Sequence, residues 1–208
     1  MTQHQYQKIS NVFARDMTTF KLIHGDWKKE EFGLLNDIQW VATEKVDGTN
    51  IRVSYIEDNL LFDGKTDRAQ IPPKLQSKLQ EIFLPKYEIM YDLFHGKEVI
   101  LYGEGYGNSI QKGGGKYSPN VDFVLFDVKV DGGWLNRLQQ EKIAESLKID
   151  IVPVVFEGTL LDIVEFTKKG FNSAWGEFQA EGVVCKPYLE MTNKYGERVI
   201  VKIKTKDF

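Results

Sequence analysis

Charged residues interrupt several apolar, strand-like stretches of this chain. Lys45 and Asp47 follow the run at residues 38–43, and Gly48 comes next. If the strand continues, Lys45 and Asp47 lie on one face, because strand side chains two residues apart point the same way. A lysine amine can act as a covalent nucleophile, and glycine lets the backbone approach a ligand closely. The segment therefore combines a candidate nucleophile, a carboxylate and a flexible backbone point.

Other charged residues lie at the borders of later strand-like runs. Glu104 closes one apolar run, Glu181 opens another, and Lys202 and Lys204 alternate with the apolar residues of the last. The alternation places both lysines on one face of the last strand. Taken singly, each of these residues is typical of a solvated edge or surface position.

The elements that must position these residues are mostly strands. Stretches rich in β-branched and aromatic residues, bounded by Gly, Asp or Asn, predict strands at 38–43, 50–56, 60–62, 98–102, 121–130, 151–156, 182–186 and 199–204. Apolar periodicity predicts helices at 74–84, 135–147 and 160–169. The last helix follows Thr159 with Asp162 three residues on, a start like a capping box, and ends at Gly170. Hairpin-like neighbours without βαβ alternation predict an α+β fold of mostly antiparallel sheets.

Composition limits the classes of function. The 208 residues are 42% hydrophobic and 27% charged, with a net charge of −3, so a broad nucleic-acid-binding surface is not expected. A polyanion site must then be a local cluster of Lys and Arg. Cys185 is the single cysteine, which rules out an intrachain disulfide and favours a reducing cytoplasm. Neither a secretion signal nor a run of 18 apolar residues occurs, so we expect no membrane span.

Two glycine-rich segments resemble phosphate loops only superficially. Residues 103–107 lack the spacing of a dinucleotide-binding fingerprint, and residues 113–117 lack the first Gly and the final Ser or Thr of a Walker A loop. A glycine loop near a phosphate and a plain surface loop both remain open.

Five motifs in order resemble those of the covalent nucleotidyltransferases, which include ATP-dependent DNA ligases, RNA ligases and mRNA capping enzymes. They are KVDG at 45–48, YGEGYG around Glu104, Phe126-Asp127, EGVVCK at 181–186 and KIK at 202–204. The details are most similar to RNA ligases of the T4 RNA ligase 2 type. Those details are Trp40-Val41-Ala42 before Glu44-Lys45, Gly48-Thr49-Asn50 after it, and Gln111-Lys112-Gly113.

The resemblance implies a nucleotidyltransferase core, ATP-grasp-like, with a nucleotide cleft between sheets. It also implies an ATP-dependent RNA ligase in which Lys45 forms lysyl-AMP, AMP passes to an RNA 5′-phosphate, and a 3′-hydroxyl seals the phosphodiester. Lys202 and Lys204 would assist catalysis, and Glu181, with Asp47, would hold Mg²⁺ or Mn²⁺. The implied nucleotide-binding residues are Glu44, Asp47, Gly48, Asn50, Glu104, Phe126 and Lys186.

RNA ends, in a nicked duplex or a broken loop, are the implied partners, and their repair is the implied purpose. Lys65 stands where the group commonly has an arginine, so the residue that handles RNA phosphate there is open. The candidates for RNA contact are Lys65, Arg68, Lys112 and Lys116. The chain ends four residues after Lys204, which predicts a single monomeric nucleotidyltransferase domain over 1–208 without a C-terminal accessory domain. A separate protein could supply that part.

Three alternatives remain. A DNA ligase or a GTP-dependent capping enzyme is disfavoured by Thr49-Asn50 and Gln111-Lys112-Gly113. A catalytically inactive module that binds nucleic-acid ends is disfavoured because the motif residues are intact, namely Lys45, Glu104, Glu181, Lys202 and Lys204.

Overall fold

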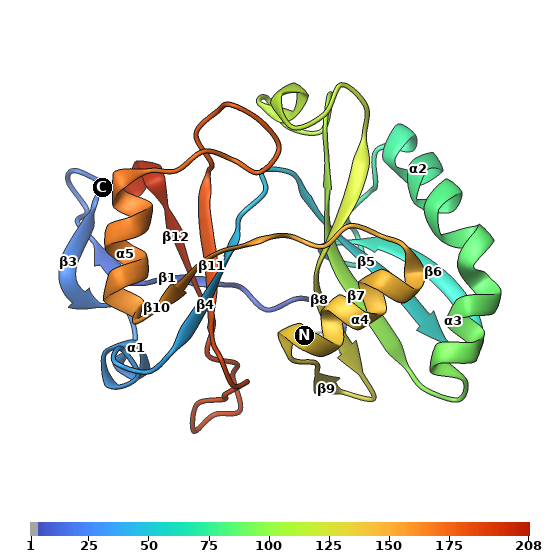
Figure 1. Cartoon of the computed structure of the whole chain (residues 1–208), viewed down its shortest axis with the longest axis horizontal. Coiled ribbons are helices and arrows are strands. Elements are labelled where there is room, and N and C mark those ends of the chain that lie inside the picture. The colour runs from blue at the N-terminus through green and yellow to red at the C-terminus, as the bar shows by residue number, and fades with distance from the viewer. Residues whose placement is uncertain (1–3) are drawn as a thin grey trace. The chain divides into compact units, whose positions relative to one another are not determined.

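Each half of the structure is organised around a five-stranded sheet (Figure 1). The computed structural model describes residues 4–208, and the chain divides into two units. Unit 1 comprises residues 4–7 with Asp47–Val152, and unit 2 comprises Lys8–Val46 with Pro153–Phe208. One unit boundary falls between Val46 and Asp47, inside the KVDG motif.

Unit 1 contains an antiparallel sheet in the order β6-β5-β7-β8-β9. Its strands are β5 (Thr49–Ile56), β6 (Asn59–Gly64), β7 (Val99–Tyr106), β8 (Asp122–Val130) and β9 (Gly133–Trp134). Its helices are α2 (Pro73–Phe83), α3 (Tyr87–Phe94) and α4 (Arg137–Leu147). Glu57 and Asp58 form the tight β5–β6 turn with positive φ angles of 48° and 59°, which suit a two-residue hairpin.

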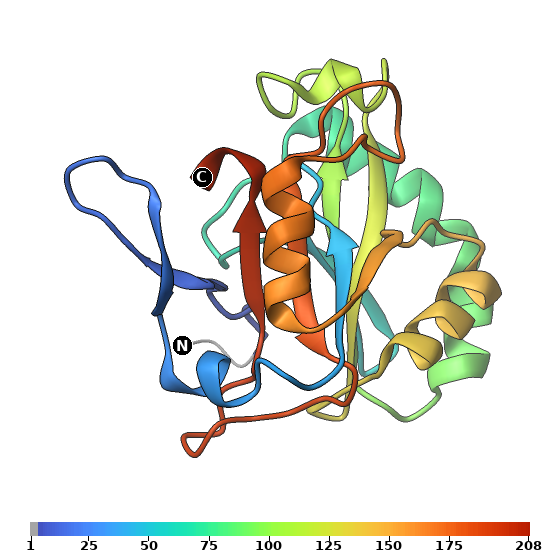
Figure 2. The same ribbon diagram turned by 60° about the vertical axis from the view of Figure 1, so that its left-hand side comes forward.

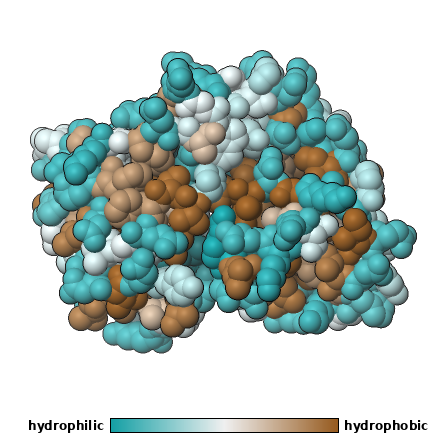
Figure 3. All heavy atoms as spheres, viewed as in Figure 1, coloured by the Kyte–Doolittle hydropathy of each residue, from teal (hydrophilic) through white to brown (hydrophobic). Residues whose placement is uncertain are grey.

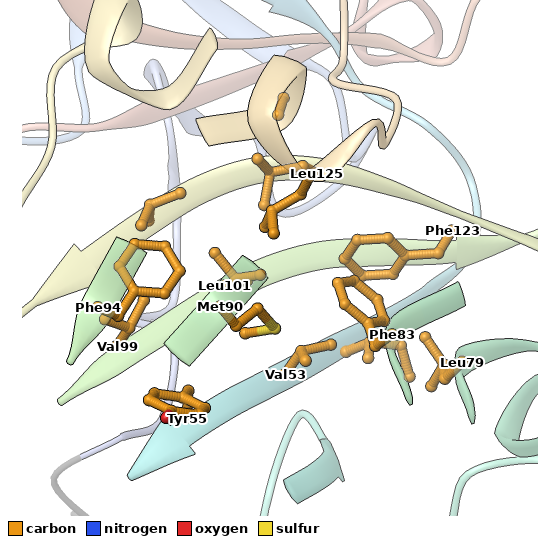
Figure 4. Close-up of a cluster of buried hydrophobic side chains, with 14 of the residues drawn as sticks. Val53, Tyr55, Leu79, Phe83, Met90, Phe94, Val99, Leu101, Phe123 and Leu125 are labelled. Atoms are coloured by element: carbon orange, nitrogen blue, oxygen red, sulfur yellow. The ribbon is translucent and has the colours of Figure 1, made fainter. Parts of the chain in front are cut away.

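One face of this sheet forms the core of unit 1. Alternate residues of β5, β7 and β8 pack against side chains from the helices, as Figure 4 shows for Val53, Leu101 and Phe123 with Phe83 and Met90. The Phe83 and Phe123 rings meet edge to face with centroids 5.3 Å apart. Because strand side chains alternate between faces, the even-numbered residues Asn50 and Glu104 are placed on the other face.

Unit 2 contains a sheet in the order β1-β12-β11-β4-β10. Its strands are β1 (Ser10–Asn11), β4 (Trp40–Glu44), β10 (Val154–Gly158), β11 (Gly182–Pro187) and β12 (Val201–Lys204). Only the β1–β12 pair is parallel among the described strands of this sheet. The unit also has the β2 (Phe13–Arg15) and β3 (Leu22–Trp27) hairpin, and helices α1 (Glu30–Leu34) and α5 (Leu160–Lys169).

Helix α5 covers the core face of the unit 2 sheet (Figure 2). Leu160, Ile163 and Val164 of α5 are buried in the same cluster as Val183 and Val201. The predicted capping box is confirmed: Thr159 Oγ1 accepts from the Asp162 N–H at 3.2 Å, and Asp162 Oδ2 accepts from the Thr159 N–H at 3.2 Å.

The predicted α+β class, with mostly antiparallel strands, is confirmed, and every predicted strand and helix has a counterpart shifted by at most a few residues. Two details were wrong. β4 ends at Glu44, so no strand continues through Lys45 and Asp47, and β7 runs to Tyr106, so Glu104 lies inside a strand. Helix α3, which the 3₁₀ turn Leu84–Lys86 joins to α2, was not predicted, and neither were β1, β2, β3, α1 and β9.

The described surface mixes hydrophilic and hydrophobic residues, as the face in Figure 3 shows. Among residues 4–208, no helix has both the length and the apolar character needed to cross a bilayer.

Candidate active site

A lysine–glutamate–lysine cluster lies at one end of the unit 2 sheet. Glu181 Oε2 accepts a hydrogen bond from Lys45 Nζ at 2.6 Å, and Glu181 Oε1 lies 2.5 Å from Lys204 Nζ. The side chains are mostly buried, with exposed fractions of 23% for Lys45, 15% for Glu181 and 24% for Lys204. The structure thus brings together three predicted site residues from three distant sequence segments.

The backbone holds this cluster in register. The Lys45 N–H donates to the Gly182 carbonyl at 2.9 Å, and the Thr205 N–H donates to the Glu181 carbonyl at 3.0 Å. Gly182 is directly paired with Lys204 between β11 and β12. Backbone hydrogen bonds between neighbouring segments therefore fix the chain at, or one residue from, each of the three cluster residues.

Gly182 is a site where only glycine fits. Its φ is +150°, and a Cβ added there would lie 2.1 Å from the Ile203 carbonyl oxygen and 2.7 Å from Lys204 Cα. Since carbon atoms do not approach backbone atoms this closely, the missing side chain lets β11 and β12 meet beside the cluster.

The cluster carries one net positive charge, since two ammonium groups face one carboxylate. Burial raises the pKa of Glu181, but Lys45 and Lys204 outweigh this effect, and the pKa lies below that of an ordinary glutamate. Glu181 is therefore ionised at neutral pH. A mostly buried site with excess positive charge favours an anion such as a phosphate.

Two further predicted lysines lie on the same face of the sheet. Lys202 is paired with Val184 and, like Lys204, alternates with the buried Val201 and Ile203, as predicted. Lys186, two residues beyond Val184, has its Nζ 3.9 Å from Glu190 Oε1.

Glu190 also pairs with the buried guanidinium of Arg198, in contact with both its Nε and its Nη2. Sequence reasoning did not find Arg198, which has no motif around it.

Glu44 lies on the opposite, core-facing side of β4. It is 2% exposed, and its Oε1 accepts from Ser173 Oγ at 2.5 Å while its Oε2 accepts from the Ala174 N–H at 2.8 Å. Burial raises the pKa of Glu44, and the two hydrogen bonds only partly offset it. The carboxylate thus holds the loop at residues 171–180, which leads into Glu181. Ser173 was not predicted, because a lone serine in a loop gives no signal.

In unit 1, Asn50 and Glu104 are direct neighbours across β5 and β7. Asn50 Oδ1 is buried and has no hydrogen-bond partner among residues 4–208. A buried polar atom without a partner is rare in folded proteins.

Asp47 and Gly48 are held by the loop at residues 107–121, between β7 and β8. Gln111 Nε2 donates to the Gly48 carbonyl at 3.1 Å, and the Asp47 N–H donates to Tyr117 Oη at 3.3 Å. A Cβ on Gly48 would lie 2.3 Å from the Gly105 carbonyl oxygen. Glycine is therefore required here by packing within unit 1, a reason that the sequence did not indicate.

Phe126 is the extra residue of a β-bulge. Tyr102 pairs with Asp127 and Gly103 pairs with Leu125, which leaves Phe126 without an opposite residue. A bulge can redirect a side chain, as often occurs beside functional sites. The Tyr6 ring meets Phe126 edge-on with centroids 5.1 Å apart, and Tyr6 Oη donates to Asp127 Oδ2 at 2.7 Å.

The four predicted RNA-contact residues all have exposed side chains in unit 1 loops: Lys65, Arg68, Lys112 and Lys116. None of them forms an ion pair with a described residue. The buried Arg52 braces the first of these loops by donating to the Gly64 carbonyl and to Asp67 Oδ1, each at 2.9 Å.

No group of three or more His, Cys, Asp or Glu side chains in residues 4–208 could hold a metal ion by itself. Of the two predicted metal ligands, Glu181 lies in the lysine cluster of unit 2, and Asp47 is the first residue of the segment Asp47–Val152 in unit 1.

Comparison with known proteins identifies a family. Residues 38–204 match the family model described as RNA ligase. An apo mutant of Naegleria gruberi RNA ligase has a TM-score of 0.72 at 17% identity, covering 99% of this chain and 56% of that one. A mutant of that ligase with AMP and Mn gives 0.72 at 16% identity over 99% and 57%, and another with ATP and Mn gives 0.68 at 17% over 97% and 60%.

The chain thus spans less than two thirds of these solved proteins, and at this identity the likeness establishes the fold. The search of curated proteins gives no match.

Proposed function

Because the chain belongs to the RNA ligase family, we propose that it is an ATP-dependent RNA ligase that acts through Lys45. The single observation that carries this proposal is the buried contact of Lys45 with Glu181, which Lys204 shares. The contact supports the proposal because it joins an amine that can serve as a nucleophile to other charged motif residues.

The proposed reaction has three steps. The Lys45 amine attacks the α-phosphorus of ATP, and pyrophosphate leaves as the phosphoramidate forms. An RNA 5′-phosphate oxygen then attacks this phosphorus, which frees Lys45 and yields an AMP-capped RNA end. Finally, an RNA 3′-hydroxyl attacks the 5′-phosphate and AMP leaves. Covalent catalysis of this kind divides one difficult displacement into easier ones.

Lys45 must lose a proton before it can attack. In this structure its Nζ donates to Glu181 Oε2 at 2.6 Å, and Lys204 Nζ holds the other oxygen of that carboxylate. We therefore expect the Lys45–Glu181 contact to open in the reactive state while Glu181 remains paired with Lys204.

Lys202, Lys204 and Lys186 stabilise the negative charge that gathers on the α-phosphate oxygens during transfer. Charged donors that are already in place stabilise such a transition state without further reorganisation. Both motif lysines of β12 lie on one face, opposite its buried residues, which supports this assignment.

The residues proposed for the nucleoside lie in unit 1. Glu104 accepts from the ribose hydroxyls, and the Phe126 ring stacks on the adenine. Asn50, with its unpaired buried Oδ1, supplies an acceptor beside Glu104. Asp47 and Gly48 contribute through their braced backbone, and Glu44 contributes by holding the loop before Glu181.

Glu181 and Asp47 are proposed as carboxylate ligands for a divalent cation that binds together with the nucleotide phosphates. Glu181 is ionised and offers hard oxygen atoms, and Mg²⁺ is commonly bound through one or two carboxylates plus water and substrate phosphates. When bound, Mg²⁺ or Mn²⁺ supplies positive charge that neutralises the phosphate oxygens. Glu181 and Asp47 are the residues that would hold it.

The proposed substrate is a broken RNA, at a nick or in a loop, and the proposed role is RNA repair. Lys65, Arg68, Lys112 and Lys116 would contact its phosphates, which gives affinity with little sequence preference. We propose that both units belong to one nucleotidyltransferase domain, which acts as a monomer in the cytoplasm. The buried thiol of Cys185 suits a reducing compartment.

The test is incubation with α-labelled ATP and Mg²⁺, followed by denaturing electrophoresis. Wild type should retain the label and Lys45→Ala should not, while Lys142→Ala, which removes an exposed lysine of α4, should label normally. Labelled GTP and nicked DNA then test the nucleotide and the polymer. Absence of label from folded wild type over a wide range of pH and metal would overturn the proposal and favour a non-catalytic module that binds RNA ends.

A further inference from the structure

Unit 1 contains a polar hollow, formed by one face of α2 and the two ends of the 107–121 loop. Its volume is about 420 Å³, and its polar lining includes Lys74, Lys78, Glu81, Asn108, Ser109 and Asn120. Sites for small ligands are commonly of this size, but they are mostly apolar. This hollow is not lined by any of the predicted site residues.

The helix side of the hollow follows from the periodicity of α2. Lys74, Lys78 and Glu81 are four and three residues apart, so they line one helical face, while Leu75 and Leu79 turn into the core. The loop side is held in shape by the Asn108 N–H, which donates to the Ser118 carbonyl at 3.0 Å. Gly107 packs so closely on Asn120 that an added Cβ would lie 2.0 Å from its carbonyl oxygen. The hollow is thus preformed.

The hollow presents several hydrogen-bond donors. Of its two lysines, Lys78 is paired with Glu81 at 2.9 Å and is also attracted by Asp122, which follows the lining residue Val121. The Lys74 ammonium, which is exposed, forms no ion pair with any residue from 4 to 208. The Asn108 and Asn120 amides and the Ser109 hydroxyl line the same space. Ammonium, amide and hydroxyl groups are the usual partners of nucleic-acid phosphates.

The neighbourhood favours a polynucleotide over a free nucleotide. Two exposed lysines, Lys112 and Lys116, belong to the same loop as Asn108 and Asn120, so donors continue beyond the hollow. The lining has no aromatic residue on which a base could stack. A sugar–phosphate backbone crossing the hollow would satisfy these donors without needing such a platform.

We propose that this hollow binds the phosphodiester backbone of the RNA substrate, away from the reacting ends. The inference rests on the proposed function for the identity of the polymer. Its contacts are to phosphates, so the hollow strengthens RNA binding uniformly across sequences and does not select among them.

The experiment measures binding of a short labelled RNA with a 5′-phosphate by fluorescence anisotropy over a series of salt concentrations. The double variant Lys74→Ala/Lys78→Ala should bind about tenfold more weakly at low salt. Its salt slope should fall by about 0.7, because a lysine that neutralises a phosphate of a single strand contributes about 0.7 and Lys78 is already paired with Glu81. Asn120→Asp, which adds a carboxylate without changing size, should also weaken binding. Lys142→Ala, an exposed lysine of α4 outside the hollow, should bind as wild type does.

Unchanged affinity and salt slope in both the double variant and Asn120→Asp would overturn the proposal. Competition by inorganic phosphate as effective as competition by unlabelled RNA of equal phosphate content would also overturn it, in favour of a free-anion site. RNA binding is scored without catalysis, and lysyl-AMP formation is assayed separately. A wild type that binds RNA through the hollow but forms no lysyl-AMP would refute the proposed function alone.

Discussion

Gly182→Ala should damage both stability and catalysis, because this glycine sets the spacing of β11 and β12 beside the lysine cluster. The added Cβ would lie 2.1 Å from the Ile203 carbonyl oxygen, whereas real Cβ atoms stay at least 3.0 Å away, so the backbone must move by about 0.9 Å. Overpacking of this kind costs about 1–3 kcal/mol. The φ of +150° adds strain of about 1–3 kcal/mol for a residue other than glycine.

The expected loss in the free energy of unfolding is therefore about 2–6 kcal/mol, a large part of the roughly 5–15 kcal/mol typical of a folded domain. The same shift moves Lys204 relative to Glu181. A misplacement of about 1 Å can cost on the order of a hundredfold in rate. We expect lysyl-AMP formation to slow by about that factor in the fraction that remains folded.

Urea unfolding measures the first effect, and the rate of labelling with α-labelled ATP measures the second. Gly176→Ala is the matched control, since it lies in the same unit and its added Cβ would find its nearest neighbour at an ordinary 3.5 Å. If Gly182→Ala unfolds within about 0.5 kcal/mol of wild type, as ordinary surface substitutions do, and labels at the wild-type rate, the reasoning about strand spacing is wrong.

Three other changes test the charged and buried networks. Glu181→Gln should lower the free energy of unfolding by about 2 kcal/mol at pH 7, between the values for surface and buried ion pairs. Because the pKa of Glu181 is lowered, the ion pair stabilises the fold above the usual glutamate pKa, and this stabilisation is lost as the pH falls through the pKa of Glu181 in the folded protein. Urea unfolding at pH 3 should therefore show a smaller difference between Glu181→Gln and wild type. A difference that does not change with pH contradicts the ion-pair account. Ser173→Ala should cost about 1.5–3 kcal/mol by removing a hydrogen bond to the buried Glu44 carboxylate. Because the pKa of Glu44 is raised, its carboxylate is protonated at pH 4 and charged at pH 8, so the loss should be larger at pH 8. Urea unfolding at both pH values measures the two losses. Equal losses would contradict a charged Glu44. Tyr6→Phe should lower the free energy of unfolding by about 1–3 kcal/mol, because Asp127 loses a hydrogen-bond donor while the ring packing on Phe126 remains. Thermal unfolding measures the change. A variant that unfolds at the same temperature as wild type would show that this hydrogen bond is not formed.

Local sequence patterns were sufficient for much of the fold. The alternation of Val201-Lys202-Ile203-Lys204 predicted which side chains are buried, and the structure confirms it. Thr159 and Asp162 predicted the start of α5 because a capping box depends only on residues three apart. The ordered motifs likewise predicted the family, since each motif is a short contiguous string.

Local patterns failed where a neighbour along the chain gave the wrong signal. The predicted helix stopped at residue 84, but the chain continues through a 3₁₀ turn that contains Pro85 into α3, whose Met90 and Phe94 are buried in the core. Glu104 was predicted at a strand end, whereas pairing with β5 and β8 extends β7 beyond it. In both cases, tertiary packing outweighed the local preference.

By itself, the sequence determined the residue types of the site, their order and the class of fold, because these depend on composition and short periodicities. Only the tertiary structure decided that Lys45 meets Glu181, which lies 136 residues away, and that Glu44 turns to the other face to hold Ser173. It also decided that Phe126 occupies a bulge, with Tyr6 against it. Strand order, register and burial set these contacts, and they arise from interactions between distant segments that no local pattern encodes.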